Sequence, residues 1–102
     1  MAGRLRAARR AAARMARLNA SVQSSDGLIE VTVGRSGELT DLRLSEQTRH
    51  RSAASLARDI LATVADARAE LADRAAAVVG ETIGADSEAG RAVLDTYRRD
   101  AR

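Results

Sequence analysis

Apolar positions in residues 3–18 recur at helical spacing. Drawn at about 100° per residue, the side chains of Leu5, Ala8, Ala12 and Met15 share one face of a helix. Ala and Arg make up most of this stretch, which contains no Pro and no β-branched residue, so its intrinsic preference is also helical. We therefore predict an N-terminal helix with one apolar face.

The next stretch changes to the two-residue alternation of β-strands. Residues 27–34 alternate apolar and polar side chains, and residues 38–44 return after a short turn at 35–37 that contains Gly. Residues 20–24 form a first, polar edge strand, because Asp26-Gly27 is a strong hairpin signal between them and the next strand. The pattern predicts a three-stranded antiparallel meander.

The same alternation predicts the inner face of the sheet. Ile29, Val31 and Val33 point to one side of their strand. Leu42 and Leu44 of the return strand are expected on the same inner face. A helix packed against this face would bury all five side chains.

A second helical period runs through residues 52–83, with Ser52 as its N-cap and with Gly80 and Gly84 as stop signals. Residues 86–102 form either a short third helix capped by Ser87 or a charged tail. The apolar stripe of the long helix consists of Leu56, Ile60, Val64, Ala67, Leu71, Ala75 and Val78.

These elements define an α+β fold with the order α-β-β-β-α, a three-stranded antiparallel sheet and a long C-terminal helix. Residues 1–84 are expected to form the domain, followed by the tail or short helix of residues 85–102. Tyr97 is the only aromatic residue, so the core is built from small aliphatic side chains. One helix cannot cover everything that the sheet exposes, and we therefore expect a homodimer.

Positive charge is concentrated at one end of the chain. Residues 1–18 hold six arginines and no acid, whereas residues 19–102 hold eleven arginines and fourteen acids. A segregated basic block indicates a polyanion partner. The alternatives are a solvated helix face and contact with an anionic membrane surface. The candidate binding residues are Arg4, Arg6, Arg9, Arg10, Arg14 and Arg17, of which all but Arg4 fall in one sector of the helix.

Composition argues against catalysis and metal chemistry. The chain contains no Cys and a single histidine, His50, which cannot build a zinc site alone. The acids Asp59, Asp66, Glu70 and Asp73 lie among arginines of the long helix and are expected to be ordinary exposed charges. Residues 49–51 form a small second basic cluster, either an exposed loop or a further phosphate contact. We expect no enzyme activity, no cofactor and no membrane span.

The strand pattern of residues 26–34, Asp-Gly-Leu-Ile-Glu-Val-Thr-Val-Gly, is followed by Gly-Glu-Leu-Thr-Asp-Leu-Arg-Leu at 37–44 and an alanine-rich helix that opens near Ser52. In these motifs and their order, residues 5–84 resemble the YbaB/EbfC family of bacterial nucleoid-associated proteins. High Ala content and the use of Arg without Lys are typical of a high-GC genome such as that of an actinobacterium.

The resemblance implies an α-β-β-β-α domain that dimerises through its sheet and long helix. It also implies that the N-terminal helix binds double-stranded DNA with weak sequence preference, which assigns DNA contact to the six arginines above. The expected location is the cytoplasmic nucleoid. Some actinobacterial relatives resemble accessory proteins of secretion, so the alternative is a protein-interaction module with no DNA role, in which the apolar face of residues 5–18 docks a partner helix.

Overall fold

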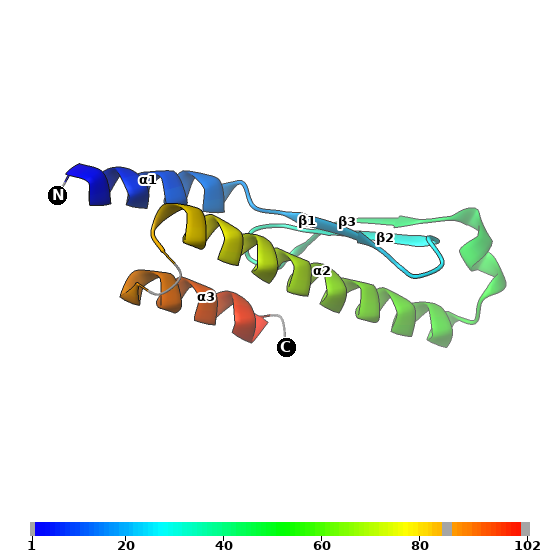
Figure 1. Cartoon of the computed structure of the whole chain (residues 1–102). Helices are drawn as coiled ribbons and strands as arrows, with labels where there is room; N and C mark the ends of the chain where they lie inside the picture. Colours follow the sequence, from blue (N-terminus) through cyan, green and yellow to red (C-terminus); the bar gives the residue numbers. More distant parts are fainter. Residues whose placement is uncertain (1, 85–86, 101–102) are drawn as a thin grey trace.

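The computed structural model describes residues 2–84 and 87–100 of the chain. A three-stranded antiparallel sheet lies against one long helix in an elongated molecule of 59 × 20 × 17 Å (Figure 1). The elements are α1 (Ala2–Ala16), β1 (Ala20–Gln23), β2 (Ile29–Val33), β3 (Leu39–Leu44), the 3-10 helix η1 (Glu46–His50), α2 (Ala53–Thr82) and α3 (Glu88–Asp100). The predicted α+β fold class and element order are confirmed, whereas η1 was not predicted.

Both hairpins of the sheet turn at a glycine in the left-handed region. The strands lie in the order β1-β2-β3, and each is antiparallel to the next. The backbone φ angle is 75° at Gly27 and 78° at Gly37, where a side chain would strain the backbone. The two turn signals read from the sequence are therefore confirmed.

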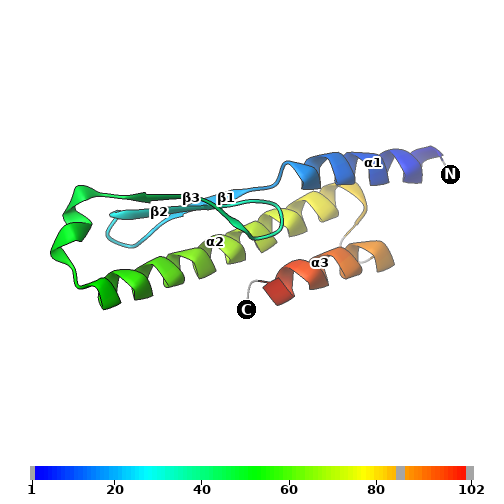
Figure 2. The same ribbon diagram turned by 180° about the vertical axis from the view of Figure 1, so that it is seen from behind.

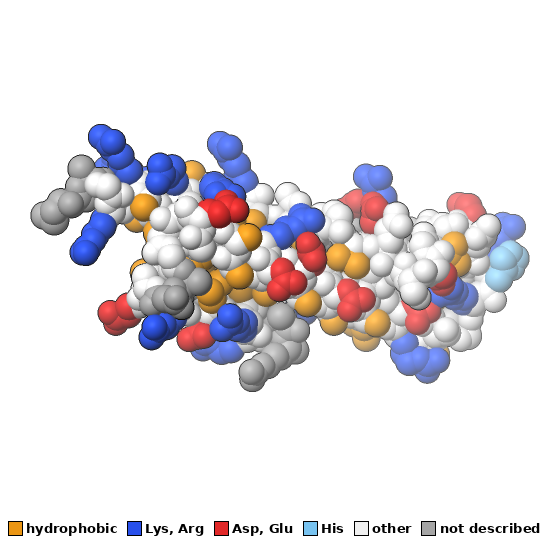
Figure 3. All heavy atoms as spheres, viewed as in Figure 1, with side chains coloured by type: hydrophobic (Ala, Val, Ile, Leu, Met, Phe, Trp, Pro, Cys, Tyr) orange, Lys and Arg blue, Asp and Glu red, His pale blue; other side chains and the backbone are white. Residues whose placement is uncertain are grey.

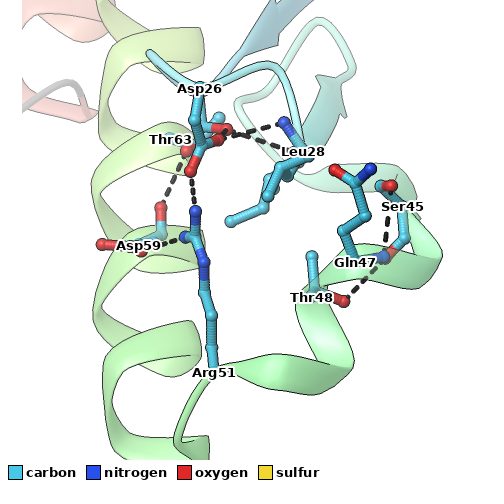
Figure 4. Close-up of polar contacts among 10 residues, drawn as sticks. Asp26, Leu28, Ser45, Gln47, Thr48, Arg51, Asp59 and Thr63 are labelled. Carbon is cyan, nitrogen blue, oxygen red and sulfur yellow. Dashed lines mark hydrogen bonds and ion pairs between the residues drawn. The ribbon is translucent and has the colours of Figure 1, made fainter.

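The central strand begins at Ile29, two residues later than predicted, because the preceding residues belong to the turn. The Asp26 carboxylate accepts a hydrogen bond of 3.0 Å from the backbone N–H of Leu28 and another of 2.7 Å from the Ser24 hydroxyl (Figure 4). The Leu28 N–H is therefore bonded within the turn and is not available for pairing with a neighbouring strand.

The core lies between α2 and the two strands β1 and β2. Ile29, Val31 and Val33 are fully buried on the helix side of β2, and Ala67 and Leu71 of α2 are buried against them. The small side chain at position 67 leaves room for the long helix to approach the strands. Ala20 is also buried there, and the partly buried residues around this core are Leu18, Val22, Leu56, Ile60, Val64 and Tyr97.

β3 lies beyond the cover that α2 provides. Leu42 and Leu44 stand opposite Val31 and Ile29 in the register, so their side chains share the helix-facing side of the sheet. Leu42 nevertheless remains 38% exposed, Leu44 44% and Leu39 47%. The predicted direction of Leu42 and Leu44 holds, but their expected burial is wrong, because a single helix is too narrow to cover three strands.

The opposite face of the sheet is polar on every strand. The Ser21 and Thr32 hydroxyls lie 2.7 Å apart, joining β1 to β2. On β3, Arg43 Nε donates to Asp41 Oδ2 at 2.9 Å, and Arg43 stands opposite Glu30 in the register. Because its side chains are hydrated and paired, this face needs no protein cover.

α3 folds back along the last turns of α2 (Figure 1). Gly84, with φ of 85°, ends the preceding turn, and the Ser87 hydroxyl caps α3 by accepting a hydrogen bond of 2.9 Å from the Gly90 N–H. A side chain at Gly90 would overlap the Gly84 carbonyl oxygen and crowd Val79. This close approach leaves Leu94 only 5% exposed. The last segment is therefore a packed helix, which decides the choice left open by the sequence.

Two arginines of α2 donate hydrogen bonds to backbone carbonyl groups at one end of the sheet. Arg68 Nε donates to the Gly37 carbonyl oxygen in the β2–β3 turn at 2.9 Å. Arg74 Nη1 donates to the Asn19 carbonyl oxygen, just before β1, also at 2.9 Å. Both bonds join residues more than thirty positions apart and fix the sheet lengthwise along α2.

A third arginine joins the far end of the sheet to the start of α2 (Figure 4). Arg51 pairs with Asp26 in the β1–β2 turn and, through Nη1, with Asp59 Oδ2 at 2.6 Å. Its side chain is only 24% exposed. The suggestion that residues 49–51 offer a further phosphate contact therefore fails for Arg51, and Asp59 is half-buried instead of an ordinary exposed charge.

Replacing Arg51 with Met should lower the free energy of unfolding by about 1–2 kcal/mol, because Asp26 and Asp59 lose their shared partner while the aliphatic stem is kept. Urea denaturation at one protein concentration measures this change. The matched control is Arg49→Met in the same loop, where the side chain is exposed and the expected effect is within about 0.5 kcal/mol. Equal denaturation midpoints for the two variants would contradict a stabilising role for the Arg51 pairs.

Candidate nucleic-acid interface

α1 contacts the end of α2 along one side and leaves most of its own surface in solvent. Ala11 is 5% exposed at this contact, whereas Leu5 is 54% exposed. Toward the N-terminus α1 extends past the last turn of α2 (Figure 1). The helix ends at Ala16, two residues earlier than predicted. The backbone N–H groups of Arg17 and Leu18 donate to carbonyl groups three residues earlier, as in a 3-10 turn, instead of four.

Four arginines line the solvent side of α1 and the turn that follows it, and they are Arg6, Arg9, Arg10 and Arg17. All four are exposed, and none forms an ion pair within the part of the chain that the structure describes. Figure 3 shows basic side chains gathered around α1 at one end of the molecule. With no acid in residues 3–18, this surface, called here the arginine face, carries uncompensated positive charge.

The other two candidate residues lie apart from the arginine face. Arg14 Nη1 lies 2.6 Å from Glu81 Oε2, close to the end of α2, and the two side chains are 48% and 60% exposed. Arg4 lines a groove on another side of α1, together with Ile83 and Ala89. The structure therefore brings four of the six candidates together and separates two from them.

Glu81 is the residue that the sequence analysis missed. Its partner Arg14 is 67 positions away, and no local spacing pattern joins the two side chains. The pair joins α1 to the end of α2, and it neutralises one charge at the edge of the arginine face.

The arrangement supports electrostatic binding. A guanidinium group donates two parallel hydrogen bonds, a geometry that matches phosphate oxygens, and an exposed helix can follow a charged surface. Among the described residues, no group of three His, Asp or Glu side chains is placed to hold a metal ion. The described helices include none that is both long and apolar enough to cross a membrane.

The chain is a small α+β domain that carries an exposed N-terminal helix rich in arginine. A family model described as the YbaB/EbfC DNA-binding family matches residues 3–86, most of the chain, and the protein belongs to this family. The resemblance seen in residues 5–84 is thereby confirmed. The family is bacterial, nucleoid-associated, DNA-binding and non-enzymatic. No curated protein matches the chain.

Glu81→Gln should loosen the docking of α1 on α2. An exposed ion pair stabilises by up to about 1 kcal/mol, so amide hydrogen exchange in α1 should accelerate by up to about fivefold. Hydrogen-exchange mass spectrometry measures this change. Glu70→Gln is the control, because Glu70 pairs with Arg74 within α2 and should leave α1 unchanged. Unaltered exchange in α1 of the Glu81 variant would show that the ion pair does not position this helix.

Proposed function

We propose that the protein is a homodimer that binds double-stranded DNA in the nucleoid through phosphate contacts made by α1, with little sequence preference. Residues 1–84 supply both the DNA-binding helix and the dimer surface, and the site of action is the cytoplasm. The observation that carries the proposal is the arginine face, a set of uncompensated charges on an exposed helix in a member of a DNA-binding family.

The mechanism is neutralisation of phosphate charge. Each arginine that reaches a phosphate releases a condensed counterion, so the logarithm of the association constant falls linearly with the logarithm of salt concentration. Arg6, Arg9, Arg10 and Arg17 supply the central contacts, while Arg4 and Arg14 extend the set from its margins. Residues 1–18 contain no Asn or Gln, the residues that read adenine, which supports weak sequence preference.

Two measures of shape support the homodimer. The chain exposes 6864 Å² of surface, whereas monomeric proteins of this mass expose about 5,500 Å². Its radius of gyration is 16.4 Å, compared with about 13 Å for compact domains of about 100 residues. The chain is therefore more extended and exposes more surface than a compact monomer of its size.

One uncovered apolar surface lies between β3 and one side of α2. Leu42 and Leu44 face the helix side of the sheet without cover, and Leu61 of α2 is 70% exposed. Leu61 precedes Arg68 by two helical turns and so lies on the side of α2 from which Arg68 reaches the β2–β3 turn. We place the dimer contact on these three residues, Leu42, Leu44 and Leu61, called the leucine strip, since the other face of the sheet is polar.

The triple variant Arg6→Ala, Arg9→Ala, Arg10→Ala should weaken DNA binding and flatten its salt dependence. It removes six positive charges per dimer, and the magnitude of the log-log salt slope should fall by up to about 5 if all six contact phosphate. Fluorescence anisotropy with a random 30-base-pair duplex at several salt concentrations measures both quantities. For the wild type, we expect affinity to fall on the order of 10³-fold between 50 and 200 mM salt.

A control variant with the same loss of charge tests whether DNA affinity depends on the arginine face or only on the net charge of the protein. Arg35, Arg49 and Arg58 are exposed and lie outside α1, so their replacement by Ala should change affinity much less. Equal weakening by both triple variants would show that α1 holds no special interface. Absence of wild-type binding at low salt would favour the alternative of a protein-interaction module without a DNA role.

Replacing both Leu42 and Leu61 with Glu should convert the dimer to a monomer, because like charges would then face each other on the leucine strip. Sedimentation equilibrium measures the oligomeric state, and circular dichroism verifies the fold. The monomer should also show about half of the wild-type salt slope, since one α1 remains per particle. Leu5→Gln is the control, a polar change at an exposed leucine away from the strip that leaves the charge of α1 unaltered. A monomeric wild type would contradict the proposal.

A further inference from the structure

An apolar groove runs between α1 and α3 with the last turns of α2 as its floor. Its volume is about 350 Å³. Ala8, Ala12 and Met15 line it from α1, Val79 and Ile83 from α2, and Val93 from α3. The groove is open to solvent along its length, since Ala8 and Ala12 are exposed. The apolar face of α1 predicted from the sequence is therefore only partly covered by the chain itself.

The three helices around the groove are arranged like three members of a four-helix bundle. In both Figure 1 and Figure 2 the end of α2 lies between α1 and α3, which run in one direction while α2 runs in the other. Four-helix bundles close around such a centre by adding one more nearly antiparallel helix. Alanine at positions 8 and 12 lets the backbone of an added helix approach closely.

Length and charge indicate what the occupant is. From Arg4 to Met15 the α1 side of the groove spans twelve residues, about 18 Å or three helical turns. Where the groove continues past Ile83, Arg4 lines it beside Thr82 and Ser87. The α1 helix of a second copy fits poorly, because it would bring five more arginines and no acid against this helix.

We propose that the groove binds an amphipathic helix of a partner protein, about three turns long. Its apolar face carries small and medium side chains that contact Ala8, Ala12 and Val93, and an acidic residue at one end pairs with Arg4. This is the helix-in-groove mode of recognition. The arginine face lies on another side of α1, so the groove shares with the proposed DNA contacts only Arg4, at their margin.

Synthetic helical peptides of about 16 residues test the proposal with the full chain at 150 mM salt. The probe has Ala and Leu along one face and Glu on its flanks. A scrambled peptide has the same composition without the apolar face, and a third peptide carries Arg in place of Glu. Fluorescence anisotropy should show saturable binding of the probe, with binding of the scrambled and Arg peptides at least about tenfold weaker.

Paired variants locate the contact. Ala12→Trp fills the groove and should weaken probe binding by about tenfold or more, whereas Ala13→Trp, one position away and outside the groove lining, should leave it unchanged. Arg4→Glu should reduce the preference for the Glu probe over the Arg peptide. Circular dichroism confirms that each variant is folded.

Three outcomes overturn the proposal. The first is equal binding of probe and scrambled peptide, and the second is equal weakening by Ala12→Trp and Ala13→Trp. The third is a lower oligomeric state of the protein alone caused by Ala12→Trp and not by Ala13→Trp, which would mean that a second copy occupies the groove. The DNA duplex assay on Ala12→Trp keeps the proposals separate, since this variant should retain wild-type DNA affinity whether or not the peptide binds.

Discussion

The packing of α2 on β2 is the contact on which the rest of the molecule depends. Burial of Ile29, Val31 and Val33 against Ala67 and Leu71 builds the only core that joins helix to sheet in the described residues. α2 has 30 residues, about 45 Å of helix, whereas the five residues of β2 extend about 17 Å. The helix therefore runs far past the sheet, and this overhang is the support on which α1 and α3 rest.

The arginines divide into two groups by what surrounds them. Arg51, Arg68 and Arg74 are held by carboxylates or carbonyl oxygens, and they join loops to α2. The arginines of the arginine face have no such partners among the described residues, because the sequence around them contains no acid. A net charge of +3 thus describes the chain poorly. What matters for binding is which charges the fold has already neutralised.

Local patterns in the sequence predicted much of the fold. The helical and alternating periods located α2 and the strands, and turn glycines located both hairpins, since these features depend on neighbouring residues. Pairs such as Arg14 with Glu81, or Arg51 with Asp26, form only after distant segments meet, and no spacing rule indicates them. The groove escaped prediction for the same reason. The helical state of the last segment depends on the contact of Gly90 with α2 and its final turn, which a charged local sequence does not reveal.

One face of β3 is apolar and the other is charged, and this difference limits how other chains can pack on the strand. An exposed edge strand that is apolar on both sides is a template for open-ended stacking into fibrils. β3 presents leucines on the side of α2, but Asp41 and Arg43 on the other. Stacking from the charged side would strip water from that ion pair. Face-to-face packing on β3 is therefore favourable only from its leucine side.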